Sequence, residues 1–320
     1  MPVNPILTFG AARNGTTFLG NLIAGHPKVW AAKHVLHHGV FEHKVLDNYL
    51  FWGDLSDPER YQDFLRQFQI DDSFLLSGLT IEELYNIQAD DFFDFFFELV
   101  DQSATKANAN YWTTKIDPSF CIHKEAWEIF IRRLRTRYKQ PYFIGIKREI
   151  IPCINSYLKM EGKHHGLRNK KHIKLLSISL GVARYITQYH WIQKKLEELG
   201  GSLIRFDDLT RNEIGINQVE KYLSLKINTE QSQSYRTNSS FYKSPNTKIE
   251  NNKLSIKFFT SFFQLSKPLG KWYYQVYETM KPPHNPASTR IFKSRYFPEV
   301  LKRELTQRGS IALLDLINTD

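Results

Sequence analysis

A short apolar run, a turn bounded by two glycines and a helical stretch open the chain, and they constrain its fold more than any other feature. The apolar run is Ile6–Gly10, the turn extends to Gly15, and the helical pattern covers Thr16–Ala24. A helix that begins directly after such a turn exposes N–H groups with no partner inside the helix, and its dipole attracts an anion. This segment therefore predicts a strand, a loop and a helix that together bind an anionic group.

The same alternation of short apolar runs and helical stretches continues along the chain. Such alternation is typical of an α/β fold, and we expect a central, mainly parallel sheet flanked by helices. The further strands expected are Trp112–Ile116, Tyr142–Lys147 and Ser202–Phe206, and the helices cover about residues 123–138, 151–160 and 175–199, the last ending at Gly200-Gly201.

The length of 320 residues allows one large core or two small ones. Because no repeat or low-complexity tail divides the chain, we expect a single domain over residues 1–320 with a core of about residues 5–225. Residues 228–252 are rich in Ser, Asn, Thr and Lys and predict a long surface segment. We expect residues 228–320 to form the C-terminal part of the same domain.

Composition predicts a cytoplasmic protein with no membrane span. The two cysteines, Cys121 and Cys153, have no metal-ligand spacing, and two lone thiols suggest a reducing compartment. The first residues lack the pattern of a signal peptide, and no run approaches the ~20 apolar residues of a spanning helix. The phenylalanine-rich stretch Asp90–Val100 contains Asp91, Asp94 and Glu98 and predicts an amphipathic helix.

The formal net charge of +10 indicates a surface that attracts polyanions. Nucleic acid, membrane phosphate and a multiply charged nucleotide all fit this charge, and so does a charge that only maintains solubility. No aromatic RNA-binding signature stands out in the sequence. The choice among these partners depends on local motifs.

The glycine-bounded turn has the spacing of a nucleotide-binding loop but lacks its lysine. In Gly10–Thr17, Thr16 stands where the pattern G-x-x-x-x-G-K-[ST] has lysine. A kinase or nucleotide hydrolase would need that lysine and an acid that binds Mg²⁺ at a strand end. Arg13 instead places a permanent positive charge in the loop, and its planar fork suits two oxygens of a phosphate or sulfate.

A second cation and a hydroxyl follow the expected strand Tyr142–Lys147. Arg148 comes directly after the strand, and Ser156 lies eight residues later in the first turns of the next helix. An arginine and a hydroxyl that converge on one point suit a phosphate monoester, although a single arginine in such a place is often only a surface ion-pair residue.

Both motifs resemble those of the sulfotransferases that use 3′-phosphoadenosine-5′-phosphosulfate (PAPS). Arg13–Phe18 (RNGTTF) is similar to the 5′-phosphosulfate loop, and Gly25–Val29 (GHPKV) is similar to the segment that follows it in carbohydrate-sulfating, tyrosine-sulfating and bacterial members. Arg148 and Ser156 keep the spacing of the 3′-phosphate motif, with Glu149 and a late Pro152 as departures. Leu203–Leu209 (LIRFDDL) is similar to a later strand and turn of the family.

The resemblance implies a sulfotransferase with a P-loop-like fold and PAPS as the donor. It places the donor on the loop residues, and the 3′-phosphate on Arg148 and Ser156. The loop residues are Arg13, Asn14, Gly15, Thr16, Thr17 and Phe18. Phe18 corresponds to an aromatic residue near the adenine, although its helix position also suits the core. The product would be 3′,5′-adenosine bisphosphate, and no metal is expected.

For the chemical step, the resemblance and imidazole chemistry together indicate His34 as the general base. His34 lies eight residues past His26, where tyrosine-sulfating members have a glutamate, and an imidazole titrates near neutral pH. His34 and His38 could share one helix face as metal ligands, but no acidic or cysteine ligand lies near them at a known spacing. Arg13 would touch the transferring group. Lys115 resembles a lysine that neutralises transition-state charge, although two residues separate it from Pro118.

The acceptor is expected to be a small molecule or carbohydrate with a hydroxyl or amine, and neither its identity nor the oligomeric state is readable. Residues of about 41–110 and of the C-terminal third would form its pocket. The basic run Lys163–His172 is either a solvated loop or a lid over the nucleotide. The alternative functions are a P-loop kinase or nucleotide hydrolase, or a basic nucleic-acid-binding protein, whereas the sulfotransferase interpretation expects no nucleic acid as a partner.

Overall fold

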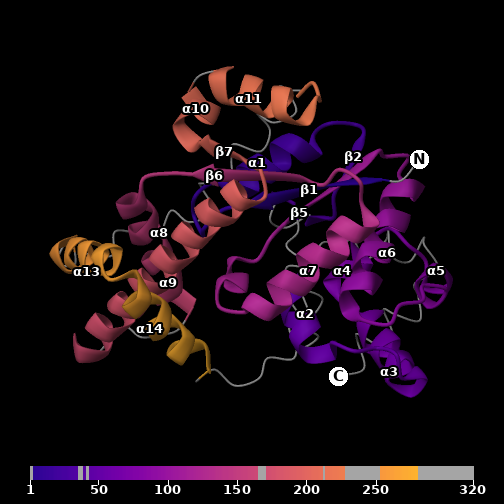
Figure 1. The fold of residues 1–320 in the computed structure, drawn as a ribbon, viewed down its shortest axis with the longest axis horizontal. Coiled ribbons are helices and arrows are strands. Elements are labelled where there is room, and N and C mark those ends of the chain that lie inside the picture. Colours follow the sequence, from indigo (N-terminus) through magenta and orange to yellow (C-terminus); the bar gives the residue numbers. More distant parts are fainter. Residues whose placement is uncertain are drawn as a thin grey trace.

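The computed structural model describes residues 3–34, 39–40, 43–164, 171–211, 213–227 and 253–279. Its centre is a five-stranded sheet in the order β2–β5–β1–β6–β7, in which every neighbouring pair is parallel (Figure 1). The predicted α/β class with a parallel sheet flanked by helices is confirmed. The strands are β1 (Asn4–Phe9), β2 (Val29–Trp30), β5 (Tyr111–Lys115), β6 (Tyr142–Lys147) and β7 (Ser202–Arg205).

Alternate residues of the strands supply the cores on the two faces of the sheet, as the two-residue period of a strand requires. Ile6 and Ile144 belong to the cluster that includes residues of α1 (Thr16–Ala24) and α11 (Glu213–Leu223). Their neighbours Leu7 and Phe143 belong to the larger cluster on the other face. Because both faces are covered, β1 and β6 are apolar over most of their length, which is what made them recognisable in the sequence.

The larger cluster is built from helices that precede and follow β5 and β6. Residues of α6, α7 and α9 bury their aromatic and aliphatic side chains in it. The helices on this side are α2 (Val45–Trp52), α3 (Pro58–Phe68), α4 (Asp72–Leu75), α5 (Ile81–Tyr85), α6 (Phe92–Lys106), α7 (Lys124–Arg137), α8 (Ile150–His164) and α9 (Lys171–Glu198), with a 3₁₀ turn, η1 (Pro118–Cys121), after β5.

The phenylalanine-rich stretch forms α6, the helix predicted from residues 90–100. Asp91 caps its N-terminus by accepting a hydrogen bond from the Asp94 N–H at 3.0 Å, and the phenylalanines are buried against α3 and α7. Rings pack mostly edge to face, as between Phe64 and Phe95, whose centroids are 4.6 Å apart. The acidic residues that interrupt the phenylalanines bind arginines of α7.

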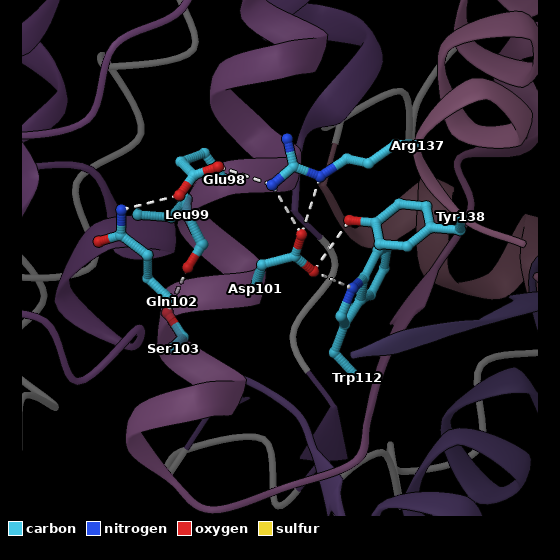
Figure 2. A network of polar contacts seen from close by, with 8 residues as sticks. All are labelled: Glu98, Leu99, Asp101, Gln102, Ser103, Trp112, Arg137 and Tyr138. Atoms are coloured by element: carbon cyan, nitrogen blue, oxygen red, sulfur yellow. Dashed lines mark hydrogen bonds and ion pairs between the residues drawn. The ribbon is translucent and has the colours of Figure 1, made fainter. Parts of the chain in front are cut away.

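Figure 2 shows how Asp101 of α6 connects this helix to β5 and α7. Its carboxylate accepts hydrogen bonds from Trp112 Nε1 at 3.0 Å, from the Tyr138 hydroxyl at 2.9 Å and from Arg137 Nε at 2.8 Å. Arg137 also binds Glu98 at 2.6 Å. A half-buried charge with this many partners fixes the position of α7 beside the sheet, and α7 leads directly into β6.

The expected strand Ser202–Phe206 ends one residue early, and that expectation is corrected. Phe206 begins a short helix, α10 (Phe206–Arg211), instead of completing the strand or forming only a turn. Asp207 and Asp208 lie in the first turn of α10, where acidic side chains interact favourably with the helix dipole. The ring of Phe206 lies against Gly15 and Phe18 at the start of α1.

Two further helices, α13 (Lys253–Leu265) and α14 (Lys267–Thr279), pack against α9, and α13 also contacts α8 (Figure 1). Tyr274 of α14 is buried and accepts a hydrogen bond from Gln188 of α9 at 3.1 Å. Within the described ranges, no helix combines the length and the hydropathy that crossing a membrane requires.

Candidate anion-binding site

The glycine-bounded turn lies between β1 and α1, as predicted, and both of its glycines are required by their surroundings. Gly15 has a φ of 101°, and a Cβ there would lie 2.5 Å from the Phe206 ring. A Cβ on Gly10 would lie 2.2 Å from the methyl group of Thr16. The chain therefore turns tightly into α1. No side chain caps the helix start, so its first N–H groups point out of the loop.

Arg13 connects this loop to the second sequence motif. Its Nε donates a hydrogen bond to the Ser156 hydroxyl of α8 at 2.9 Å, across 143 residues of sequence. Arg13 has a φ of 68°, an uncommon conformation for a residue with a side chain, and its carbonyl accepts a contact from Cys153 Sγ at 3.5 Å. The two predicted motifs thus meet, with Ser156 held by the arginine of the loop.

Arg148 follows β6 and is exposed, and its guanidinium lies over the ring of Phe206 at 4.5 Å from the centroid. Burial raises the pKa of the Cys153 thiol, while the charges of Arg148 and Arg13 act in the opposite direction. Both arginines are therefore close enough to act on one buried sulfur atom. Stacking on a ring fixes the orientation of the guanidinium, so that the N–H groups at its edge can bind an anion in a defined direction.

The two arginines lie where an α/β fold usually binds its ligand. The chain leaves β1 toward β2 on one side of the sheet, and it leaves β6 toward β7 on the other side. The carboxyl ends of β1 and β6 therefore form the topological switch point, outside which ligands of open parallel sheets bind. Arg13 follows the first of these strands and Arg148 follows the second.

Lys115 ends β5 on the other side of β1. Its backbone pairs with Thr8 near the end of β1, so the lysine belongs to the same edge of the sheet as the loop. Asp117 then caps the 3₁₀ turn that begins at Pro118 by accepting a hydrogen bond from the Ser119 N–H at 2.7 Å. Three predicted cationic residues, on three neighbouring strand ends, are thus gathered at one edge.

Asn14 attaches the loop to α9 and β6 in the protein interior. Its side chain is buried, accepts a hydrogen bond from the Tyr185 hydroxyl of α9 and donates to the Ile146 carbonyl of β6 at 3.5 Å. Burial raises the pKa of Tyr185, which keeps the hydroxyl protonated as a donor. Asn14 therefore holds the loop and does not face outward with Arg13.

Phe18 packs on the loop side of α1. Its ring meets that of Phe206 in a T-shaped contact at 6.3 Å, and it belongs to the partly buried residues around the smaller core. Thr16 and Thr17, also partly buried, precede it in the first turn of α1, directly after Gly15. The first turn of the helix thus combines backbone donors, hydroxyls and an aromatic ring.

His34 lies in a small hairpin that is attached to α1. It ends β3 (Lys33–His34), which pairs antiparallel with β4 (Gly39–Val40). The Val40 N–H donates a hydrogen bond to the buried Asn21 side chain of α1 at 2.8 Å. The backbone of His34 is therefore fixed relative to the helix that begins at the loop. The description of His34 covers its backbone, whereas His37 and His38 lie outside the described residues.

Two histidines that flank His34 in the sequence, His26 and His43, have contacts that support the fold. His26 accepts a hydrogen bond from the Lys28 N–H at 3.1 Å through Nδ1, which shapes the turn between α1 and β2, and burial lowers its pKa. His43 is buried against Trp30 and Phe96, and burial lowers its pKa to about 3. His43 therefore stays uncharged.

Sequence reasoning missed three residues that shape the site, Cys153, Tyr185 and Phe206. Cys153 and Tyr185 lie in ordinary helical patterns that do not distinguish them from the core. Phe206 lies in the segment Leu203–Leu209, whose resemblance to a strand and turn assigned no role to its ring. Residues 165–170 of the basic run lie outside the described part of the chain. Within that part, no group of three or more His, Cys, Asp or Glu residues is arranged to hold a metal ion.

The solved structures that this chain resembles include two sulfotransferases. The sulfotransferase STF1 from Mycobacterium tuberculosis H37Rv is 16% identical over 80% of this chain and 77% of that chain, with a TM-score of 0.43. The sulfotransferase domain from the curacin biosynthetic pathway is 14% identical over 97% of this chain and 98% of that chain, with a TM-score of 0.40. No protein-family model and no curated protein matches the chain.

Proposed function

We propose that this protein transfers a sulfuryl group from PAPS to a hydroxyl or amine of a small-molecule or carbohydrate acceptor. The observation that carries the proposal is the hydrogen bond of 2.9 Å between Arg13 and Ser156 at the switch point, with Arg148 beside it. This contact brings together two motifs that each resemble a donor-binding element. The donor carries anionic groups at both its 5′ and 3′ ends, which is what two separate cationic elements would bind.

The residues at the sheet edge fit such a donor. The uncapped start of α1 and the loop N–H groups would hold the 5′-phosphosulfate, while Arg148 and Ser156 would hold the 3′-phosphate. PAPS would supply an activated sulfuryl group when bound. Arg13 would stabilise charge on the bridging oxygen, and Lys115 would add a second cation from the next strand end, a role that needs no metal ion.

In the transfer, the bond from sulfur to the phosphate oxygen breaks and a bond from sulfur to the acceptor oxygen or nitrogen forms. The acceptor loses a proton, and 3′,5′-adenosine bisphosphate leaves with the electron pair of the broken bond. We assign the removal of the proton to His34, because its hairpin is attached to α1 and because imidazole has a suitable pKa.

Binding is tested by thermal shift with 3′,5′-adenosine bisphosphate, ATP with Mg²⁺, and RNA. A ligand at 100 times its Kd adds ~2.7 kcal/mol to the free energy of unfolding, and only the bisphosphate should do so well below millimolar concentration. Transfer of radiolabelled sulfate from PAPS to panels of acceptors should follow, with activity retained in EDTA. Stabilisation by ATP with Mg²⁺ or by RNA alone, or a loss of activity that added metal restores, would contradict the proposal.

The role of His34 is tested separately. His34→Ala should reduce turnover ~10²–10⁴-fold, because a general base acts on the acceptor proton. Its affinity for the bisphosphate should equal that of the parent, and the acidic limb of the pH–rate profile should disappear. His37→Ala and His38→Ala are the matched controls and should have mild effects. Parental turnover in His34→Ala on the true acceptor would remove His34 from this role.

A further inference from the structure

The outer surfaces of α13 and α14 are unusually apolar. In the described part of the chain ten large hydrophobic side chains are exposed, and six of them fall between residues 254 and 272. Isolated exposed hydrophobic residues are common, but a concentration on two consecutive helices marks an interaction surface. The six are Leu254 (83% exposed), Phe258 (64%), Phe262 (41%), Leu265 (89%), Leu269 (40%) and Trp272 (58%). We call these six residues the C-terminal apolar face.

Helix geometry places these residues opposite the protein core. On α13, Leu254, Phe258 and Phe262 are four residues apart, and the last two rings stack at 6.2 Å. Ile256 and Phe263 of the same helix are buried on the side that packs against α8 and α9. Both sides of α13 are therefore apolar, and the packing against α8 and α9 accounts for only one of them.

The charged residues of the two helices that carry the face are four lysines and one acid, Glu278, which lies near the end of α14. Between residues 253 and 277 the sequence contains four lysines and neither Asp nor Glu. Lys257, Lys267 and Lys271 are exposed beside the apolar residues. Lysines can keep their ammonium groups in water while their alkyl chains lie along an apolar surface, and a tryptophan such as Trp272 suits the boundary between apolar and polar layers.

We propose that the C-terminal apolar face binds the headgroup layer of an anionic lipid bilayer. An apolar helix surface with lysines along it and an excess of positive charge is the pattern of helices that lie in the plane of a membrane. Each lysine near an anionic surface adds electrostatic attraction to the burial of the apolar side chains. The net charge of +10 acts in the same direction at longer range.

Charge favours a lipid surface over two other occupants of the face, a second copy of this chain and a different protein. A second copy of the chain would bring the same lysines against each other, and like charges across an interface are unfavourable. The centres of protein interfaces are also depleted of lysine. The proposal concerns a surface remote in sequence from the donor loop and does not depend on the proposed reaction.

Binding is measured by sedimentation of the full chain with vesicles. The protein should bind vesicles of phosphatidylcholine and phosphatidylglycerol and should bind pure phosphatidylcholine vesicles much more weakly. The affinity should fall as salt is raised, because screening weakens the attraction of the lysines. Lys257→Gln, Lys267→Gln and Lys271→Gln together should weaken binding on the order of 100-fold. The charge-matched control replaces the exposed Lys124, Lys139 and Lys221 by Gln and should have a clearly smaller effect.

The apolar part is tested with the two most exposed leucines. Leu254→Ser with Leu265→Ser should weaken vesicle binding ~10–100-fold, because less apolar surface enters the bilayer. The unfolding temperature should change little, since both side chains are exposed. Ile214→Ser on α11, which is 64% exposed, is the matched control and should bind like the parent. Vesicles should also shift the tryptophan emission to shorter wavelength, and Trp272→Phe should remove this shift while binding remains.

Three outcomes would overturn the proposal. The first is that the full chain fails to bind anionic vesicles at low salt. The second is that the leucine and lysine variants bind as well as their controls. The third is that the parent does not bind vesicles but forms a dimer in light scattering that Leu254→Ser with Leu265→Ser converts to a monomer, which would assign the face to a second copy of the chain.

Discussion

Arginines in two regions of the molecule have opposite surroundings. On α7, Arg133 binds Asp91 and Asp94 at 2.5 and 2.7 Å. Arg137, one turn later on α7, binds Glu98 and Asp101 of α6. At the switch point, Arg13 donates to the neutral hydroxyl of Ser156, and Arg148 lies on an aromatic ring. The first two arginines bind carboxylates, whereas these contacts of the second two are with groups that carry no charge.

The difference separates arginines that hold the fold from arginines suited to an outside anion. A guanidinium between two carboxylates has its bidentate edge occupied, and its removal leaves negative charges unpaired. A guanidinium that stacks on a ring or donates to a hydroxyl is oriented by a group that carries no charge. Net positive charge is therefore a poor guide to the site, and the partners of each arginine are a better one.

The largest effect expected from this comparison is on turnover. Arg13→Ala should lower the rate of sulfuryl transfer ~10²–10³-fold, the usual cost of removing one preorganised donor to a developing charge. The unfolding temperature should change little, because Arg13 is exposed. Arg13→Lys keeps the charge but loses the fork and should recover part of the rate. A large loss of stability in Arg13→Ala would instead place Arg13 with the structural arginines.

Arg137→Ala should show the reverse pattern. Its removal leaves Glu98 and Asp101 without their cation, and we expect a loss of ~2–3 kcal/mol in the free energy of unfolding, reduced from the fully buried case because the pair is partly exposed. Chemical denaturation measures this loss. Arg135→Ala on the same helix, which is exposed, is the control. Affinity for 3′,5′-adenosine bisphosphate should not change, and a selective loss of that affinity would break the comparison.

Arg148→Ala should weaken the binding of 3′,5′-adenosine bisphosphate by ~1.5–3 kcal/mol, the usual worth of a hydrogen bond to a charged group. Calorimetry measures this difference. Arg205→Ala is the matched control, because Arg205 is an exposed arginine at the end of the neighbouring strand β7. Equal losses of affinity in both variants would mean that the bisphosphate responds only to the total positive charge at this edge of the sheet and makes no specific contact with Arg148.

The smallest effect concerns a carboxyl group that lies beside another acid. Burial and the neighbouring Asp71 raise the pKa of Asp72 to about 7, although Lys44 acts against them. The folded protein therefore keeps this proton to higher pH than the unfolded chain, so stability should fall as pH rises from about 4 through about 7. Asp72→Asn should be more stable than the parent at pH 8, by ~1–2 kcal/mol, and should show a flatter profile.

Unfolding temperatures between pH 4 and pH 8 check this prediction. Asp63→Asn, at an exposed acid of α3, is the control and should keep the parental profile. A parental profile in Asp72→Asn as well would mean that other groups set the pH dependence.

Much of the sheet could be predicted because its strands are buried on both faces. The bounds of β6 and α1 match the expected ranges, since an apolar run and a glycine turn mark them locally. The helices α2 to α5 and the β3–β4 hairpin were not predicted. These elements are short, and their positions depend on packing against α6 and α1, which a local pattern does not contain.

The candidate site, like the sheet, could be predicted in part from the sequence. Arg13 and Arg148 stand next to recognisable strand ends, and the parallel sheet brings such ends together. Ser156, which binds Arg13, was also named from its spacing. Tyr185 and Phe206 were not predictable as site residues, because a tyrosine in a helix or a phenylalanine after a strand has the pattern of any core residue. The contact between Tyr185 and Asn14 joins positions 171 residues apart, and only the tertiary structure reveals it.

Helix α9 connects the contact between Tyr185 and Asn14 to the C-terminal helices. Tyr185 of α9 donates a hydrogen bond to Asn14 of the loop, and three residues later Gln188 donates one to Tyr274 of α14. The loop Gly10–Gly15 and a helix of the C-terminal apolar face are thus attached to adjacent turns of one 28-residue helix. If a shift of α9 favours one ligand, thermodynamic linkage requires that lipid alters the affinity for nucleotide by the same factor as nucleotide alters the affinity for lipid.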